Sequence, residues 1–271
     1  MTGAARATAD ARDRVTGPAP SLPQAAAVFV AYCVVVVGLM RLSGVAYADF
    51  FDTAGSTLRS AVVPLAAGSA LLLVVLRWTG WRVRDERPRP AMGFLWVLPA
   101  VMVATLLLRL AGAAWSQLDV GLVAAALLAS VLVGFAEETL FRGIILTALR
   151  GRVRSEAVAA LVVTLWFGLF HLSNLLLGEP AAVAQVGLAA LAGVGFYLAR
   201  RGTGTLVAAM VLHGAWDFSA FLTGTAGGTG PVAGIGNLLI FVVYALAAVT
   251  LVVVLVTERR RPPAGVPARR P

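Results

Sequence analysis

Residues 120–149 read VGLVAAALLASVLVGFAEETLFRGIILTAL, a run of 30 residues with only three ionisable side chains, Glu137, Glu138 and Arg142. About 20 apolar residues of helix cross the hydrocarbon core of a bilayer, where backbone groups find no water and must pair within the helix. The stretch is therefore predicted to be a transmembrane helix. A charge in the middle of a membrane costs at least about 2.5 kcal/mol, so each of the three charged groups requires a specific explanation.

The same apolar character extends along most of the chain. Of its 271 residues, 59% are apolar and 13% are charged, and the mean hydropathy is +0.88, whereas soluble domains carry about 25% charged residues. The candidate spans lie at about 24–40, 60–76, 92–111, 120–149, 156–177, 182–199, 204–223 and 235–256. Because we find no convincing repeat and no second domain, the predicted fold is an all-α, polytopic transmembrane helical bundle of about eight spans.

Polar segments flank the predicted bundle, which covers residues 24–256. Residues 1–23 and 257–271 are rich in polar residues, Arg and Pro, and are predicted to be disordered cytoplasmic tails. After the first apolar block, Ala46-Tyr47-Ala48 resembles a signal-peptidase site. The polar segment before that block is long for a signal peptide, so we favour an uncleaved first span. Cleavage would leave seven spans in the same orientation.

The arginines predict how the bundle is oriented, because cytoplasmic loops are enriched in basic residues. All 22 basic residues are arginine; the predicted spans place 18 of them on one side of the membrane and three on the other, with Arg142 inside a span. Both termini are therefore expected on the cytoplasmic side of the cell (plasma) membrane. The net charge of +9 does not predict a nucleic-acid partner, because the arginines stand at the ends of apolar blocks. The expected partners are membrane lipid and a substrate near the bilayer.

Three further ionisable residues lie well inside predicted spans. They are His171 in the fifth span and His213 and Asp217 in the seventh, and the chain has no other histidine. At about 1.5 Å of rise per residue, Glu138 lies roughly 18 Å and His213 roughly 15 Å from the cytoplasmic end. One layer near the midplane is therefore expected to hold the six groups, although they come from three spans.

The spacing of these groups predicts which of them pair. Glu138 and Arg142 are four residues apart, so they share a helix face and can form an ion pair. Glu137 is rotated by about 100° from Glu138 and is free to point elsewhere. His213 and Asp217 are also four apart. The pattern favours a carboxylate held ionised beside an arginine, with two imidazoles across a water-filled cavity, where a carboxylate can act as a general base.

Other interpretations of the polar residues stay open at this point. A buried polar cluster could serve only to lock helices together. Intramembrane Glu, His and Arg are also parts of proton relays, so a proton-coupled transporter is an alternative function; it predicts paired discontinuous helices and repeat symmetry, and we find neither signature. In the sixth span, Gly187, Gly193 and Gly195 are predicted to allow close helix packing.

Three ordered motifs in successive spans resemble those of the CPBP family, the membrane-embedded CAAX-protease and bacteriocin-processing group, whose motifs read EExxxR, FxxxH and HxxxN or HxxxD. In this chain they read Glu137-Glu138-Thr139-Leu140-Phe141-Arg142, Phe167-Gly168-Leu169-Phe170-His171 and His213-Gly214-Ala215-Trp216-Asp217. The resemblance covers roughly residues 118–220, which would be the protease core. It implies an intramembrane endopeptidase, a peptide or protein substrate near the bilayer, and the eight-span fold of the CAAX prenyl endopeptidase branch. A non-proteolytic scaffold of the same fold is a further alternative.

The resemblance also implies roles for the six residues. Glu137 would activate a water that His171 helps to hold, and His213 with the residue at position 217 would stabilise the oxyanion of the tetrahedral intermediate. Glu138 and Arg142 would orient the first motif. Asp217 departs from the asparagine of the prenyl-protease branch; an ionised aspartate would repel an oxyanion, so it would have to be protonated or support His213 from behind.

A divalent metal such as zinc is the one cofactor that these residues suggest. Glutamate and histidine side chains can provide a tetrahedral zinc site with an open water position, and Glu137, His171 and His213 would then be the ligands. The chain lacks the H-E-x-x-H helix that would make zinc a strong prediction. We favour a metal-free mechanism with a glutamate-activated water.

Overall fold

The computed structural model describes residues 18–83, 92–226 and 230–259, and within them it contains helices and loops but no β-strand. Eight helical stretches are long and apolar enough to cross a membrane. The predicted all-α, eight-span bundle is thus confirmed, and the protein is a multi-pass membrane protein. The predicted tails, 1–23 and 257–271, lie mostly outside the described residues. Where they are described they are partly helical, because the first helix begins at Leu22 and the last ends at Arg259.

The helices follow one another with short connections. The first four spans are α2 (Leu22–Leu42); α3 (Ala54–Thr57) continued by α4 (Val63–Thr79); α5 (Val97–Ala111); and α6 (Val120–Glu138) continued by the π-helical segment Thr139–Ile145 and α7 (Leu146–Arg150). The other four are α8 (Glu156–Phe170) continued by the 3₁₀ segment His171–Leu177; α9 (Ala182–Thr203); α10 (Leu206–Ala226); and α11 (Pro231–Arg259).

Several helix ends follow directly from the sequence. Asp119 caps α6, because its side-chain oxygen accepts a hydrogen bond of 2.9 Å from the backbone N–H of Leu122. Ser21 and Gln24 form a capping box at the start of α2. At the other end of a helix, Gly204 follows α9 with φ of 78°, a left-handed conformation that glycine adopts without steric cost.

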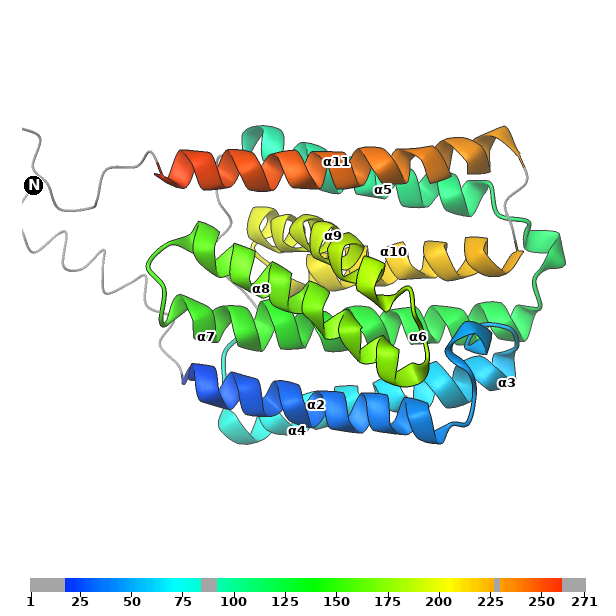
Figure 1. The fold of residues 1–271 in the computed structure, drawn as a ribbon, viewed down its shortest axis with the longest axis horizontal. Coiled ribbons are helices and arrows are strands. Elements are labelled where there is room, and N and C mark those ends of the chain that lie inside the picture. Colours follow the sequence, from blue (N-terminus) through cyan, green and yellow to red (C-terminus); the bar gives the residue numbers. More distant parts are fainter. Residues whose placement is uncertain (1–17, 84–91, 227–229, 260–271) are drawn as a thin grey trace, which may run out of the picture.

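The spans run alternately up and down, so the two ends of the bundle differ in character. The start of α2, the end of α11 and the α7–α8 turn all lie at one end, on the left in Figure 1. This end also holds the arginines that close α4, α7 and α9, namely Arg77, Arg150, Arg200 and Arg201. We call it the arginine end. The other end holds the loop between α2 and α3 and the loop between α8 and α9 (Figure 1).

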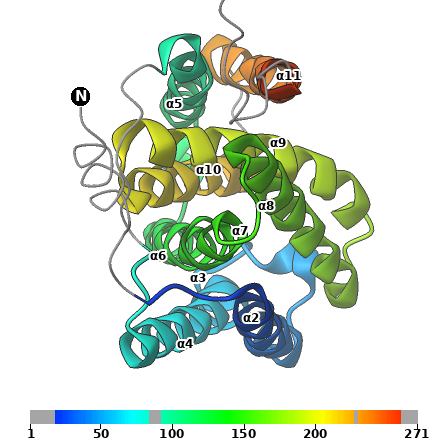
Figure 2. The same cartoon turned by 90° about the vertical axis from the view of Figure 1, so that its left-hand side faces the viewer.

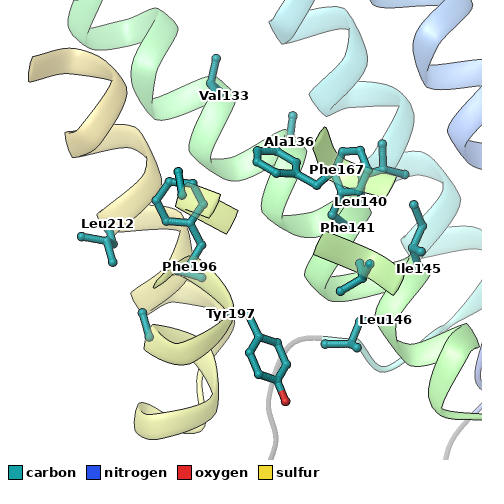
Figure 3. Packing of buried hydrophobic residues seen from close by; sticks show 14 of the residues in the cluster. Val133, Ala136, Leu140, Phe141, Ile145, Leu146, Phe167, Phe196, Tyr197 and Leu212 are labelled. Atoms are coloured by element: carbon teal, nitrogen blue, oxygen red, sulfur yellow. The ribbon is translucent and has the colours of Figure 1, made fainter. Parts of the chain in front are cut away.

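Helices α6 and α10 occupy the middle of the bundle. Figure 2 shows α5 and α11 on one side of them and α2 and α4 on the other, with α8 and α9 packed together on a third flank. The core between these helices is apolar and aromatic, with side chains such as Val133 from α6, Phe196 from α9 and Leu212 from α10 (Figure 3). Residues at the centre of α6 and α10 are therefore shielded from lipid.

The outer helices present apolar side chains outward, as a lipid-facing surface requires. On α11, the large exposed side chains include Ile235, Leu238, Phe241, Val249 and Val252. The polar groups lie inside instead, where Glu138 and Arg142 are both completely buried. This distribution is inverted relative to that of a soluble domain and indicates that the ionisable residues act within the bundle.

At the arginine end, a polar cluster joins three helical elements. Arg150 at the end of α7 donates a hydrogen bond of 2.9 Å to the Glu156 carboxylate at the start of α8. The Tyr197 hydroxyl on α9 donates a 2.6 Å bond to the same carboxylate. This end of the bundle is consequently held closed by side-chain bonds between neighbouring helices.

Candidate active site

Two glycines bring α6 and α10 into backbone contact beside the first and third motifs. A Cβ atom at Gly134 would lie 2.3 Å from the carbonyl oxygen of Met210, and a Cβ at Gly214 would lie 2.7 Å from that of Ser130. Neither space admits a side chain, so the small residues set the helix separation. Because Glu137 is on α6 and His213 is on α10, this contact fixes the distance between the two motifs.

Glu138 and Arg142 form the buried ion pair that their spacing predicts. Arg142 Nη1 donates to Glu138 Oε1 over 2.9 Å, and both side chains are completely buried. Arg142 Nη2 donates to the backbone carbonyl of Gly193 on α9, also over 2.9 Å. The guanidinium lies 4.3 Å from the centroid of the Phe167 ring and 5.6 Å from that of Phe196. Arg142 thus links α6, α8 and α9 in a dry environment.

His213 stands between three carboxylates. Its Nδ1 lies 2.8 Å from Glu138 Oε1. Since Glu138 is paired with Arg142 and is therefore an acceptor, Nδ1 carries the proton and donates it. On the other side of the ring, Nε2 lies 3.5 Å from Asp217 Oδ2 and 3.9 Å from Glu137 Oε2. The position behind His213 is thus taken by Glu138, and Asp217 instead faces the nitrogen that points away from Glu138.

Phe196 fixes the plane of the His213 ring. The two rings stack with centroids 4.3 Å apart and an angle of 15° between their planes. Phe167 adds an edge contact at 5.6 Å. With its Nδ1 bonded and its face stacked, the imidazole is left with Nε2 as the atom that can act on a ligand.

His171 is held at the end of α8, where the helix tightens into the 3₁₀ segment. Its Nδ1 lies 3.0 Å from the carbonyl oxygen of Phe167, so Nδ1–H is the donor and Nε2 is the unprotonated nitrogen of the neutral ring. The ring also contacts the edges of Phe167 and Phe170. His171 therefore presents an acceptor nitrogen from the second motif.

A cavity of about 610 Å³ brings four of the six predicted residues together. Glu137, His171, His213 and Asp217 all line it. Glu138 and Arg142 are absent from the lining and lie behind His213, completely buried. The six residues thus form one cluster with two layers, in which four groups face a shared space and the ion pair supports them from behind.

Part of this support has no signal in the sequence. Phe196 stacks on His213, but no motif marks it. Gly193 is predicted to allow close helix packing, whereas a Cβ there would lie 2.5 Å from Arg142 Nη2, so this glycine makes room for the guanidinium. Gly195 does pack closely, against Met102. The same prediction is wrong for Gly187, because a Cβ there would meet no atom within 4 Å.

The donor set fits a metal poorly. Among residues 18–83, 92–226 and 230–259, no three His, Cys, Asp or Glu side chains are grouped so that they could hold a metal ion. The predicted ligands for a metal are Glu137, His171 and His213. They all line the cavity, but they do not form such a group.

Comparison with known proteins agrees with the three motifs. Residues 119–219 match the family model described as type II CAAX prenyl endopeptidase Rce1-like. No curated protein and no solved structure matched the chain. The match spans all six residues of the site, from α6 to α10, and confirms the predicted resemblance to the CPBP family over about residues 118–220.

Proposed function

Because residues 119–219 form an Rce1-like domain of the CPBP family, we propose that the protein is an intramembrane endopeptidase that hydrolyses a peptide bond with a glutamate-activated water. One observation supports this proposal above the others. Glu137 Oε2 and His213 Nε2 face each other over 3.9 Å, inside a cavity that His171 and Asp217 also line. A general base and an oxyanion donor that line the same cavity are what hydrolysis of an amide requires.

Glu137 acts as the general base. Its side chain lines the cavity, where a water can reach the carboxylate, and its Oε2 is buried with no hydrogen-bond partner among the described residues. In the first step the water oxygen bonds to the scissile carbonyl carbon, and the water proton passes to Glu137. The resulting tetrahedral intermediate collapses when the C–N bond breaks, and Glu137 returns the proton to the leaving amine.

His213 acts as an imidazolium cation, so that Nε2–H stabilises the oxyanion while Nδ1–H stays bonded to Glu138. The Glu138 carboxylate accepts from Nδ1–H and orients the ring, and Arg142 holds Glu138 in place. Before substrate binds, Asp217 and Glu137 are the acceptors nearest to Nε2. The carbonyl oxygen of the substrate accepts from Nε2–H as it becomes negatively charged; Glu137 is then neutral because it holds the water proton, and Asp217 must be protonated, since an ionised carboxylate would repel the oxyanion. His171, with Nε2 as an acceptor, helps to hold the attacking water.

The remaining aspects of the function follow from the predicted orientation. The termini face the cytoplasm, and the bundle lies in the plasma membrane in contact with lipid. Residues 118–220 are the protease core, and the substrate is a peptide or protein close to the bilayer.

The test is a cleavage assay with the purified full chain and a library of membrane-tethered peptides. Glu137→Gln removes the base and should lower kcat by at least about 100-fold, and His213→Ala, which removes the oxyanion donor, by about 100- to 1,000-fold. His171→Ala should reduce cleavage as well. Cys33→Ser, which alters a partly buried side chain of α2 that does not line the cavity, is the matched control and should cleave like wild type.

Cleavage by all three site variants at the wild-type rate would contradict the mechanism. Substrate flux in proteoliposomes without any cleavage would favour the proton-coupled transporter. A glutamate-dependent reaction also predicts that a chelator leaves kcat unchanged and that the purified protein holds less than one equivalent of metal, as elemental analysis would measure.

A further inference from the structure

Three polar side chains form a second hydrogen-bonded group in the cavity, apart from the six motif residues. Asn174 Nδ2 donates to Gln185 Oε1 over 2.8 Å and to the Tyr47 hydroxyl over 3.3 Å. All three residues line the cavity that Glu137 and His171 also line. The hydrolytic steps use none of the three, so their presence in the wall requires a separate explanation.

The group is assembled from three elements that are distant in the sequence. Tyr47 lies in the 3₁₀ turn after α2, Asn174 in the 3₁₀ segment after α8, and Gln185 in the first turn of α9. The loops that carry them lie at the same end of the bundle in Figure 1. Each of these side chains is partly accessible, as expected for residues of a cavity wall.

The bonds hold the amide of Asn174 in one orientation. Nδ2 carries two N–H groups, and its two hydrogen bonds use both of them. The side-chain carbonyl oxygen, Oδ1, accepts no hydrogen bond within the described residues. Unlike the unpaired Glu137 Oε2, this oxygen is not buried. Asn174 therefore contributes a fixed and accessible acceptor to the cavity wall.

The 3₁₀ segment places this acceptor at a defined distance from the reacting groups. His171 and Asn174 are three residues apart in His171–Leu177. Side chains with this spacing are eclipsed in a 3₁₀ helix, and a rise of about 2 Å per residue separates them by about 6 Å along its axis. An extended peptide advances about 3.3 Å per residue. Asn174 thus lies about two substrate residues away from the water that His171 helps to hold.

An acceptor fixed in this way is complementary to the backbone of an extended peptide. Every residue except proline has a backbone N–H, and these donors recur at regular intervals along the chain. A donor that leaves water on entering the cavity costs free energy unless it finds an acceptor there. The Asn174 carbonyl can satisfy one such N–H whatever side chain the residue carries.

We propose that Asn174 is the backbone-binding residue of a substrate subsite, where its Oδ1 accepts the N–H of the residue about two positions from the scissile bond. Gln185 and Tyr47 are positioning residues, because they orient the amide. The proposal rests on the proposed function and adds a specificity rule to the same site: the residue whose N–H meets Asn174 cannot be proline.

The first experiment measures binding and does not depend on cleavage. A dye-labelled member of the membrane-tethered peptide library is selected for binding to the full-length Glu137→Gln protein in detergent. Each backbone N–H of this peptide is then replaced in turn by N–CH₃. At one position the replacement should raise Kd by about 5-fold, the effect of one lost hydrogen bond.

The same peptides are titrated into the Glu137→Gln, Asn174→Leu double variant. Methylation at the sensitive position should now change Kd by less than about 2-fold, because its acceptor is gone. Asn237→Leu is the matched control, since Asn237 is exposed on α11 and does not line the cavity; it should keep the 5-fold ratio. A purely structural role for Asn174 predicts that all peptides weaken equally and that the ratio survives. That result would overturn the proposal.

The second experiment tests the specificity rule with the active wild-type chain. Proline at the sensitive position removes the N–H and should raise KM by at least about 5-fold with little change in kcat. Asn174→Leu should cleave the proline peptide and the parent peptide with similar KM values. Mass spectrometry of the products locates the scissile bond, which should lie two residues from that position.

The outcomes separate the subsite from the activity. If the wild-type chain cleaves the proline peptide with the same KM as the parent, the subsite is wrong and the endopeptidase stands. If no peptide is cleaved, the proposed function fails, while the methylated peptides still decide whether Asn174 binds a backbone N–H.

Discussion

Two neighbouring glutamates occupy quite different environments in this protein. Glu138 is completely buried and its Oε1 is bonded to both Arg142 and His213, whereas Glu137 lines the cavity; the Oε2 atoms of both have no partner among the described residues. One helical step of about 100° separates the two side chains. This rotation alone gives one carboxylate a structural position and the other a position open to water.

The two glutamates should therefore respond differently to the same substitution. Glu138→Gln leaves the buried Arg142 guanidinium without its carboxylate and should lower the free energy of unfolding by about 3–5 kcal/mol. Glu137→Gln removes no ion pair with Arg142 and should leave the unfolding temperature near that of wild type. Thermal unfolding of both variants in the same detergent is the measurement. Equal losses of stability in both variants would contradict the assigned positions.

The sequence predicts local pairs better than distant ones. The Glu138–Arg142 pair follows from a spacing of four residues, and the structure confirms it. No comparable spacing links Arg142 to Gly193 or His213 to Phe196, because these contacts join residues that are far apart in the chain. Such partners depend on how α9 packs against α6 and α10, which hydropathy does not determine. The catalytic roles of the six residues stay predictions.

At the level of the elements, the contact between α6 and α10 sets the geometry of the site. Gly134→Ala places a Cβ within 2.3 Å of the Met210 carbonyl oxygen, so the two helices must separate. A displacement of about 1 Å in catalytic groups can lower the rate about 100-fold, and we expect a loss of this order in kcat.

The control for this variant is Gly187→Ala on α9, where a Cβ would meet no atom within 4 Å. It should retain wild-type activity and stability. Peptide cleavage and unfolding temperature, measured side by side, give the comparison. An active Gly134→Ala protein would show that the close contact does not control the distance between Glu137 and His213.

The existence of each span was predictable, but several of its ends were not. The second span was expected at 60–76 and in fact extends over Ala54–Thr79. Its first turn contains Ser56 and Thr57, which lower the hydropathy but return their hydroxyl hydrogen bonds to the carbonyl oxygen of Thr53. The π-helical segment Thr139–Ile145 was not foreseen either, since an apolar run has no signal for a wider turn.

For the molecule as a whole, the first span is part of the site. Val36, Val37 and Met40 of α2 line the cavity, and Tyr32 of the same helix is completely buried. Cleavage after Ala48 would remove this wall. We therefore expect the mature protein to keep the first span, as favoured from the sequence.

Mass spectrometry of C-terminally tagged protein purified from membranes checks this expectation. The mass should correspond to a chain of 28.1 kDa plus the tag. A chain deliberately begun at Asp49 should lose cleavage activity, because its cavity lacks the wall from α2. Native protein whose first residue is Asp49 would show that the span is a signal peptide.

The layer of Phe141, Phe167 and Phe196 has a consequence for the membrane itself. Where water enters the cavity as far as Glu137, less apolar material separates the two sides of the membrane. Protons cross a thinner apolar barrier more readily. Phe167 and Phe196 line the cavity and are 1% exposed, whereas Phe141, Leu140 and Ile144 do not line it and are 0% exposed. Together these side chains form an apolar layer between the cavity and the arginine end. This layer opposes the passage of protons through the protein and so preserves the membrane potential.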